Sequence, residues 1–215
     1  MIWKLFSKKG NQMQNTMKNR YSCRKFNGEK IGDEIVREII DLTRLSPSSC
    51  GLEPWKFMVV SNGDKLQKLG EICNNQPQVK NCSHAVIIIA RNDLKVGEAY
   101  LDKCVRRRAT TSEKYNAAMV YFRDKFKDMD EKAMTNYASK QCYLACANLV
   151  NVAESFGVKS CIIAGFDKEK LTKYVRNEAN LNENFTPILV VALGKGDNIK
   201  FPHTRHPLED VLIWK

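Results

Sequence analysis

The fold is decided by Cys142-Tyr-Leu-Ala-Cys-Ala-Asn-Leu-Val-Asn-Val-Ala153, a stretch that is apolar on almost every side when it is wound as a helix. We predict one long helix over residues 132–156, ended by Gly157, because glycine readily adopts the left-handed conformation of a helix cap. A helix that is apolar all round is buried on every side. In a chain of 215 residues, this pattern indicates a core shared with a second subunit.

The segments on either side predict more helices than strands. Residues 31–45 repeat isoleucine and leucine at helical spacing, with Asp33 as the expected N-cap. Because helices and strands do not alternate regularly, we favour an α+β fold over a doubly wound sheet. Further helices are expected at 64–73, within 95–130 and after Asp167, a polar loop at 74–81, and strands at 55–60, 84–91, 160–163 and 186–193.

The composition indicates a single domain over residues 1–215, because hydrophobic residues are 43% and charged residues 27% of the chain. The longest apolar runs, 85–90 and 187–193, are much shorter than the roughly 20 residues of a membrane span. The N-terminal stretch has no apolar core of signal-peptide length. We therefore expect a cytoplasmic protein without a membrane partner. Residues 1–19 are expected to form an N-terminal arm and residues 195–215 a C-terminal tail.

The chain is basic, with 35 lysines and arginines against 24 acidic residues and a formal net charge of +11. Such a charge attracts nucleic acid, anionic membranes or small anions. The densest cluster is Lys103-Cys-Val-Arg-Arg-Arg108, which lacks the interleaved aromatic residues that stack on bases. We interpret it as a helix face or an anion-attracting rim. No nucleic-acid partner is expected. Nucleic-acid binding is an alternative that rests only on the net charge of +11 and on Arg106-Arg-Arg108.

Cysteine and histidine are not arranged as metal ligands. The eight cysteines include no Cys-x-x-Cys pair, and we expect them to be small buried hydrophobic residues. Cys142 and Cys146 lie one helical turn apart without a nearby histidine, which is a poor zinc site. We therefore expect no metal site.

Polar clusters at the boundaries of elements are the candidate binding residues. There is no Gly-x-Gly-x-x-Gly, Walker loop or Gly-x-Ser-x-Gly motif. The segment 20–24 offers two arginines and a serine hydroxyl, which suit an anionic group. Loop hydroxyls occur at 46–49, and a run of amide side chains at 75–78 can bind the edge of a heterocycle. At 164–165, small residues let backbone N–H groups approach a planar ligand, and a further basic pair occurs at 203–205.

In this order, the clusters resemble the FMN-dependent nitroreductase family, of the oxygen-insensitive NAD(P)H nitroreductase type. The matching motifs are Arg-x-Ser-x-Arg-x-Phe from residue 20, Ser-Pro-Ser-Ser-x-Gly-x-Glu-Pro-Trp-Lys-Phe from residue 46, Asn-Gln-Pro-Gln from residue 75, Ala-Ser-Lys-Gln-x-Tyr-x-x-x-x-Asn from residue 138 and Gly-Phe-Asp from residue 165. The resemblance implies an α+β sandwich with a central, mostly antiparallel sheet flanked by helices. It also implies an intertwined homodimer in which the long helices form the dimer core and the C-terminal tail wraps the partner.

By position, the resemblance implies two FMN molecules at the dimer interface, each bound by both chains. The phosphate would be held by Arg20, Ser22 and Arg205, and Arg24 would lie near the N1/O2 edge of the ring. The serine loop would come from the other subunit. The expected cofactor-binding set is Arg20, Tyr21, Ser22, Arg24, Pro47, Ser48, Ser49, Gly51, Asn75, Gln78, Ile162, Ile163, Ala164, Gly165, His203 and Arg205, and Tyr121 and Phe122 are expected to line the substrate pocket.

The implied reaction is two-electron reduction of nitroaromatics, quinones or related acceptors by NADH or NADPH, with ping-pong hydride transfer. The flavin carries the chemistry, so no catalytic side chain is expected. Three positions depart from many family members: Ala164 stands where glutamate is common, and Gln78 and His203 stand where lysine is common. These departures keep open a flavin-binding or flavin-handling protein with low turnover on the same fold.

Overall fold

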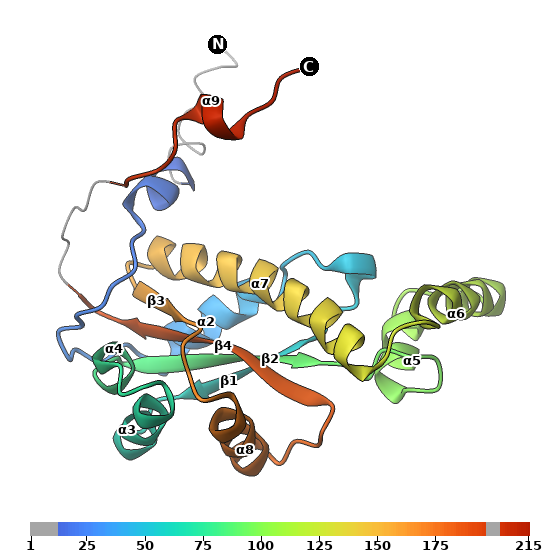
Figure 1. Cartoon of the computed structure of the whole chain (residues 1–215), viewed down its shortest axis with the longest axis horizontal. Coiled ribbons are helices and arrows are strands. Elements are labelled where there is room, and N and C mark those ends of the chain that lie inside the picture. Colours follow the sequence, from blue (N-terminus) through green and yellow to red (C-terminus); the bar gives the residue numbers. More distant parts are fainter. Residues whose placement is uncertain (1–12, 197–202) are drawn as a thin grey trace.

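A four-stranded antiparallel sheet forms the centre of the computed structural model, which describes residues 13–196 and 203–215 (Figure 1). The strands run in the order β1-β2-β4-β3. Each neighbouring pair is antiparallel, with β2 and β4 in the middle. The strands are β1 (Trp55–Val60), β2 (His84–Arg91), β3 (Lys159–Ile163) and β4 (Phe185–Gly194). The predicted α+β fold with an antiparallel sheet is confirmed.

The central strand β2 is buried on both faces because its sequence, His-Ala-Val-Ile-Ile-Ile-Ala-Arg, is apolar at consecutive positions. Successive side chains of a strand point to opposite faces. Ala85, Ile87 and Ile89 therefore join one hydrophobic cluster, and the alternate residues Val86 and Ile88 join the other. The sheet thus separates two apolar layers, and helices must cover both.

Four helices supply that cover (Figure 1). On one face, α2 (Asp33–Thr43) packs against α7 (Glu131–Ser155), and both contribute to the same apolar cluster as β2 and β4. On the other face lie α3 (Gly63–Ile72) and α8 (Lys168–Ala179). The α8 helix begins as predicted, because the Asp167 side chain accepts a hydrogen bond from the Lys170 backbone N–H.

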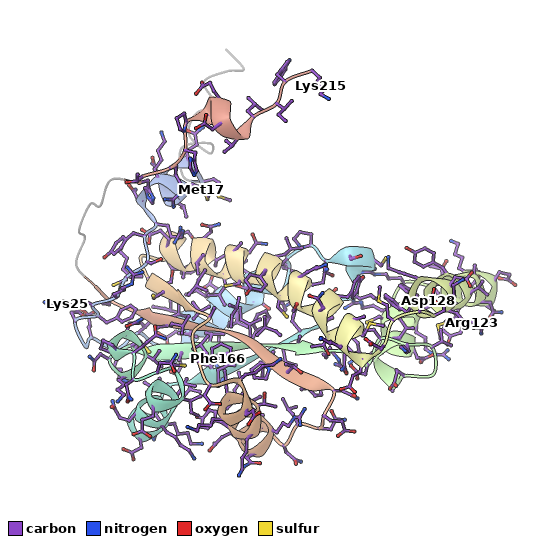
Figure 2. All side chains as sticks on the ribbon, in the orientation of Figure 1. Met17, Lys25, Arg123, Asp128, Phe166 and Lys215 are labelled. Atoms are coloured by element: carbon purple, nitrogen blue, oxygen red, sulfur yellow. The ribbon has the colours of Figure 1, made fainter. Side chains whose placement is uncertain are left out.

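A third apolar cluster lies beyond the sheet, in the region predicted only as helices of variable packing. It is formed by α5 (Ala99–Arg106), α6 (Ser112–Phe126) and the start of α7. Phe122 and Phe126 stack at 5.8 Å between ring centroids. This helical lobe extends from one end of the sheet, where Figure 2 labels Arg123 and Asp128.

The long helix α7 confirms the predicted span but is not buried on every side in the single chain. Cys142, Ala145 and Leu149 are fully buried against the sheet. By contrast, Tyr143 is 54% exposed and Leu144 is 47% exposed. The apolar sequence is therefore covered along one side only, and the other side leaves large apolar groups in contact with solvent.

The helical segment 13–19 and the C-terminal tail from residue 203 lie on the same side of the body (Figure 1). Residues 13–19 are helical, and the short helix α9 (Leu208–Val211) lies within the C-terminal tail. The tail is apolar and open, since Ile213 is 83% and Trp214 is 89% exposed. Parts of the predicted arm and tail, residues 1–12 and 197–202, lie outside the described residues.

Two local predictions are wrong. Gly32, not Asp33, is the N-cap of α2, and the Asp33 carboxylate instead accepts from His84 Nε2 at 2.9 Å. The polar loop at 74–81 contains a short helix, α4 (Pro77–Lys80), because proline is pre-organised for the first turn of a helix. The first prediction was misplaced by one residue, and the second missed a helix of four residues.

The buried position of β2 gives a first test. Replacing Ile87, which is fully buried, with alanine is expected to lower the free energy of unfolding by about 2–5 kcal/mol, because it leaves a cavity between close-packed layers. The matched control is Val120→Ala on α6, where the side chain is 52% exposed; its effect should stay within about 0.5 kcal/mol. Urea denaturation at one protein concentration measures both, and equal losses would contradict the assigned burial.

Candidate functional site

The opening cluster lies beside β3. The Cys23 backbone N–H donates to the Ser160 carbonyl at 2.9 Å, and Ser22 forms an isolated parallel bridge with Ser160. Lys159 places its Nζ 5.5 Å from the centroid of the Tyr21 ring. The same ammonium pairs with Glu154 Oε1 at 2.8 Å. Side chains from the end of α7 and the start of β3 therefore hold the segment 20–24 against the sheet.

Both arginines of that segment lie near buried thiols. Burial raises the pKa of Cys146 to about 12, and the Arg20 guanidinium opposes that rise. Burial likewise raises the pKa of Cys161, and Arg24 opposes it. Cys161 is only 4% exposed, so the structure favours packing over a redox role for this thiol.

The amide loop after α3 meets the end of β3. Gln76 Nε2 donates to the Gly165 carbonyl at 2.8 Å, and Asn75 accepts from Lys80 Nζ at 2.9 Å. Asn74 and Asn75 both have a left-handed φ, of 56° and 57°, which asparagine tolerates better than most residues. This turn brings the loop under the strand end, although 89 residues separate the bonded pair.

Gln78, which is predicted to bind the edge of the flavin, is buried in this structure. It is 8% exposed, and its Nε2 donates to Gln76 Oε1 at 2.7 Å. Gln78 therefore supports Gln76, which the sequence analysis passed over although it stands in the same amide run. The signal for Gln76 was present, but only the fold shows which amide reaches Gly165.

We call residues 20–24, 74–78 and 162–165 the β3 group. Ser22, Arg24, Asn75, Ala164 and Gly165 are all exposed there. Among the described residues, the N–H groups of Ala164 and Gly165 have no backbone partner. Ile162 is exposed, whereas Ile163 is buried in the core and contributes only backbone. The β3 group thus combines cations, a hydroxyl, an amide and free N–H donors, a donor set that fits a flavin phosphate and a heterocyclic ring.

The serine loop forms a second group, which we call the η1 group: residues 46–51, including the short helix η1 (Ser49–Gly51). It is bound to α7 at two places. Gln141 Oε1 accepts from the Ser49 N–H at 2.9 Å, and Asn148 Nδ2 donates to Ser46 Oγ at 2.9 Å. Residues 141 and 148 are two turns apart on one face of the helix. Both belong to the long-helix motif of the sequence, yet neither was predicted as a site residue.

Arginines from the basic cluster hold the turn that follows. Arg108 donates to the carbonyls of Cys50 and Gly51, the latter at 2.7 Å. Arg107 pairs with the Glu53 carboxylate at 2.6 Å. Cys50, Gly51 and Glu53 all have a left-handed φ, between 48° and 56°, a conformation that costs energy in residues other than glycine. The basic cluster is therefore used within the chain to fix a strained turn.

The two groups lie far apart in one chain. In Figure 1, β3 and α4 lie at one end of α7, and the η1 group lies toward the end that carries α5 and α6. Figure 2 places Lys25, next to the β3 group, and Arg123, in the helical lobe, at opposite ends of the molecule. Pro47, Ser48, Ser49 and Gly51 therefore do not share a pocket with the β3 group of the same chain.

The remaining predicted residues are distributed over the tail and the lobe. His203 and Arg205 are exposed on the tail, where Arg205 donates to the carbonyl of its neighbour Thr204. Tyr121 is 51% exposed and lies beside the η1 group, with its hydroxyl 3.5 Å from Cys50 Sγ. Phe122 is buried in the lobe core, so it supports α6 and does not present its ring to solvent as expected of a pocket mouth.

Comparison with known proteins assigns this arrangement to a family. The family model described as "Nitroreductase family" matches residues 17–195. The chain belongs to the nitroreductase family. It is 33% identical over 217 residues to a Staphylococcus haemolyticus protein named "Putative NAD(P)H nitroreductase", covering 94% of this chain and 98% of that protein. The predicted nitroreductase-type oxidoreductase is confirmed at this level.

Solved structures of other nitroreductase-like proteins share the fold. A nitroreductase-like protein of Streptococcus mutans aligns with a TM-score of 0.82 and 21% identity over 95% of this chain and 98% of that chain. A nitroreductase of Exiguobacterium sibiricum, solved in complex with FMN, aligns with a TM-score of 0.78 and 20% identity over 94% of this chain and 97% of that chain. Within the described residues of this chain, no helix is long and apolar enough to cross a membrane.

The turn that Arg107 and Arg108 hold in place gives a second test. An added Cβ at Gly51 would lie 1.8 Å from Arg108 Nη2, at a φ of +56°. Gly51→Ala is therefore expected to lower the free energy of unfolding by about 1 kcal/mol or more, through backbone strain and displacement of the arginine. Gly63→Ala is the matched control, since nothing lies within 4 Å of its added Cβ. Thermal unfolding compares them, and a neutral Gly51→Ala would show that the turn is not constrained.

Proposed function

We propose that this nitroreductase-family protein is an FMN-dependent NAD(P)H oxidoreductase that reduces nitroaromatics, quinones or related two-electron acceptors. The observation that carries the proposal is the β3 group. Cations, hydroxyls and backbone N–H donors that have no backbone partner among the described residues converge there from three distant segments. Family membership and the NAD(P)H nitroreductase names of the relatives support it. The absence of an evident nucleophile or paired carboxylates agrees with chemistry carried by a cofactor.

The residues of the β3 group have distinct roles in this proposal. Arg20 and Ser22 hold the FMN phosphate, a dianion that forked guanidinium donors bind well. Arg205 joins them from the tail, with His203 beside it. Arg24 provides a positive charge at the ring edge, and Asn75 donates to the ring. When bound, FMN supplies the capacity to accept a hydride from NADH or NADPH and to pass it on.

The backbone at Ala164 and Gly165 directs the reactive edge of the ring. Two N–H donors there lie in fixed positions at the end of β3, and Gln76 anchors the Gly165 carbonyl from the other side. Because Ala164 and Gly165 carry only a methyl group or no side chain of their own, a planar ligand can approach the backbone closely. The nicotinamide donor and the acceptor then use the same open face in turn, which gives ping-pong kinetics.

A homodimer completes the site. The η1 group cannot reach the β3 group of its own chain, so we place Pro47, Ser48, Ser49 and Gly51 against the flavin bound by a second copy. The exposed apolar side of α7 and the apolar tail supply surfaces for that association, because large exposed apolar patches mark interaction sites. Tyr121, next to the η1 group, would then border the opening where the acceptor binds.

The alternative is a flavin-binding protein with low turnover on the same fold. It is motivated by Ala164, Gln78 and His203, which replace charged residues common in the family. The structure adds one observation: the uncharged Gln78 is turned inward toward Gln76. Arg24 is left as the main cation expected at the ring. A less positive surrounding stabilises the reduced flavin less.

The spectrum of the purified protein tests the function. We expect flavin absorbance that bleaches rapidly when NADH or NADPH is added without oxygen, and returns when a quinone or nitrofuran follows. Slow bleaching would favour the low-turnover alternative, and a colourless protein that takes up no FMN would refute both.

Arg20→Met is expected to weaken FMN binding about tenfold or more by removing a charge-assisted hydrogen bond. Lys18→Met is the control: it changes an exposed residue two positions before Arg20, and it should leave FMN binding unchanged.

The oligomeric state gives a separate test. Leu144→Glu places a charge on the exposed side of α7, where a buried charge without a partner would be costly in a dimer. We expect the wild-type protein to sediment as a dimer and the variant to shift toward monomer with loss of bound FMN. Asp128→Asn, an exposed change in the connection between α6 and α7, is the control (Figure 2). A monomeric wild-type protein that retains FMN would contradict the shared site.

A further inference from the structure

Residues of α6, η1 and α7 form a cluster of hydrogen-bond donors that the proposed flavin site does not use. Lys125 Nζ lies 5.7 Å from the ring centroid of Tyr121, 6.0 Å from that of Phe126 and 5.8 Å from that of Tyr137. Three rings thus surround one ammonium, which is half-buried. We call Cys50, Tyr121, Lys125 and Tyr137 the Lys125 cluster.

The two tyrosine hydroxyls and the cysteine thiol of the cluster are further hydrogen-bond donors, and none of them is a carboxylate that could pair with Lys125. Tyr121 Oη lies 3.5 Å from Cys50 Sγ. The Tyr137 hydroxyl is buried, and its polar neighbour is the Ser49 side chain. Each of these groups can donate a hydrogen bond to an oxygen atom.

No carboxylate of the described residues pairs with Lys125. The nearest acidic side chain in the turn, Glu53, is already held by Arg107 at 2.6 Å, with Arg108 at 3.9 Å. Aromatic faces attract a cation, but they do not replace an anion. A half-buried ammonium beside two phenols and a thiol therefore has positive potential and spare donors, and the group that complements it is an oxyanion.

The position of the cluster connects it to electron transfer. Cys50 belongs to η1, and its neighbours Ser48 and Ser49 are the residues that we place against the flavin of a second copy. A molecule entering over that flavin would pass the Lys125 cluster. We propose that Lys125, with the Tyr121 hydroxyl, binds an anionic group, either a carboxylate on the electron acceptor or the phosphate by which NADPH differs from NADH. This inference rests on the proposed function and specifies the charge of its substrates.

Two sources of the anion can be separated with matched compounds. 4-Nitrobenzoate and 4-nitrobenzamide differ by one negative charge on the same nitroaromatic ring. NADPH and NADH differ by one phosphate. If the acceptor carries the anion, Lys125→Met should lower the kcat/KM ratio of nitrobenzoate to nitrobenzamide about tenfold, the expected effect of one charge-assisted hydrogen bond. If the donor carries it, the NADPH to NADH ratio should fall instead.

Binding is measured separately from turnover. Isothermal titration calorimetry of the FMN-loaded oxidised protein with nitrobenzoate, nitrobenzamide, NADP⁺ and NAD⁺ should show the same change in ratio. Methionine keeps an unbranched chain among the three rings while removing the charge. Lys125→Arg keeps the charge and should retain most of the discrimination. The control is Lys127→Met, which removes an exposed lysine just beyond α6.

The outcomes distinguish this inference from the proposed function. An active wild-type protein whose ratios are unchanged by Lys125→Met in both measurements overturns the anion site and leaves the oxidoreductase intact. Equal changes in Lys127→Met also overturn it, since they would reflect general surface charge. A wild-type protein that binds FMN but is reduced by neither donor refutes the proposed function, and calorimetry still decides whether Lys125 discriminates charge.

Discussion

The structure depends on the two-sided character of α7. One side packs against β2 and β4 and closes one of the two apolar layers of the sheet, with Cys142, Ala145 and Leu149 fully buried. The same side carries Gln141, which binds the η1 group through the Ser49 backbone. The opposite side leaves Tyr143 and Leu144 open. Because burying apolar surface is the main driving force of association, the helix that organises the monomer also prepares it to pair.

Charge in this protein is used mainly at short range. The net charge of +11 suggests a surface that attracts polyanions, yet each arginine of the basic cluster has an intramolecular partner: Arg106 pairs with Asp102, Arg107 with Glu53, and Arg108 with two carbonyls. These contacts hold a turn with three left-handed residues in place. Lys125 differs, because rings surround it and no carboxylate of the described residues pairs with it. Arg106, Arg107 and Arg108 therefore stabilise the fold, whereas Lys125 is available to bind a ligand.

Much of the fold was predictable because its signals are local. The predicted strand at 84–91 is β2 to the residue, and the long helix differs by one residue at each end. The Asp167 cap and the left-handed Gly157 followed from residue chemistry alone. One failure came from a long-range contact: Asp33 bonds to His84, 51 residues away, instead of capping its own helix. Where a side chain has two possible hydrogen-bond partners, the tertiary structure decides which of them is near enough to bind.

The sequence by itself determined most of the elements and the α+β class, because periodicity and caps are properties of neighbouring residues. Its motifs carried the resemblance to the family, and that resemblance implied the antiparallel sheet. Only the tertiary structure decided how candidate residues are used. It joined the amide loop to Gly165, turned Gln78 inward, buried Phe122, and separated the η1 group from the β3 group. The physical reason is that hydrogen-bond partners and burial depend on segments brought together from distant parts of the chain, and sequence spacing carries no measure of that distance.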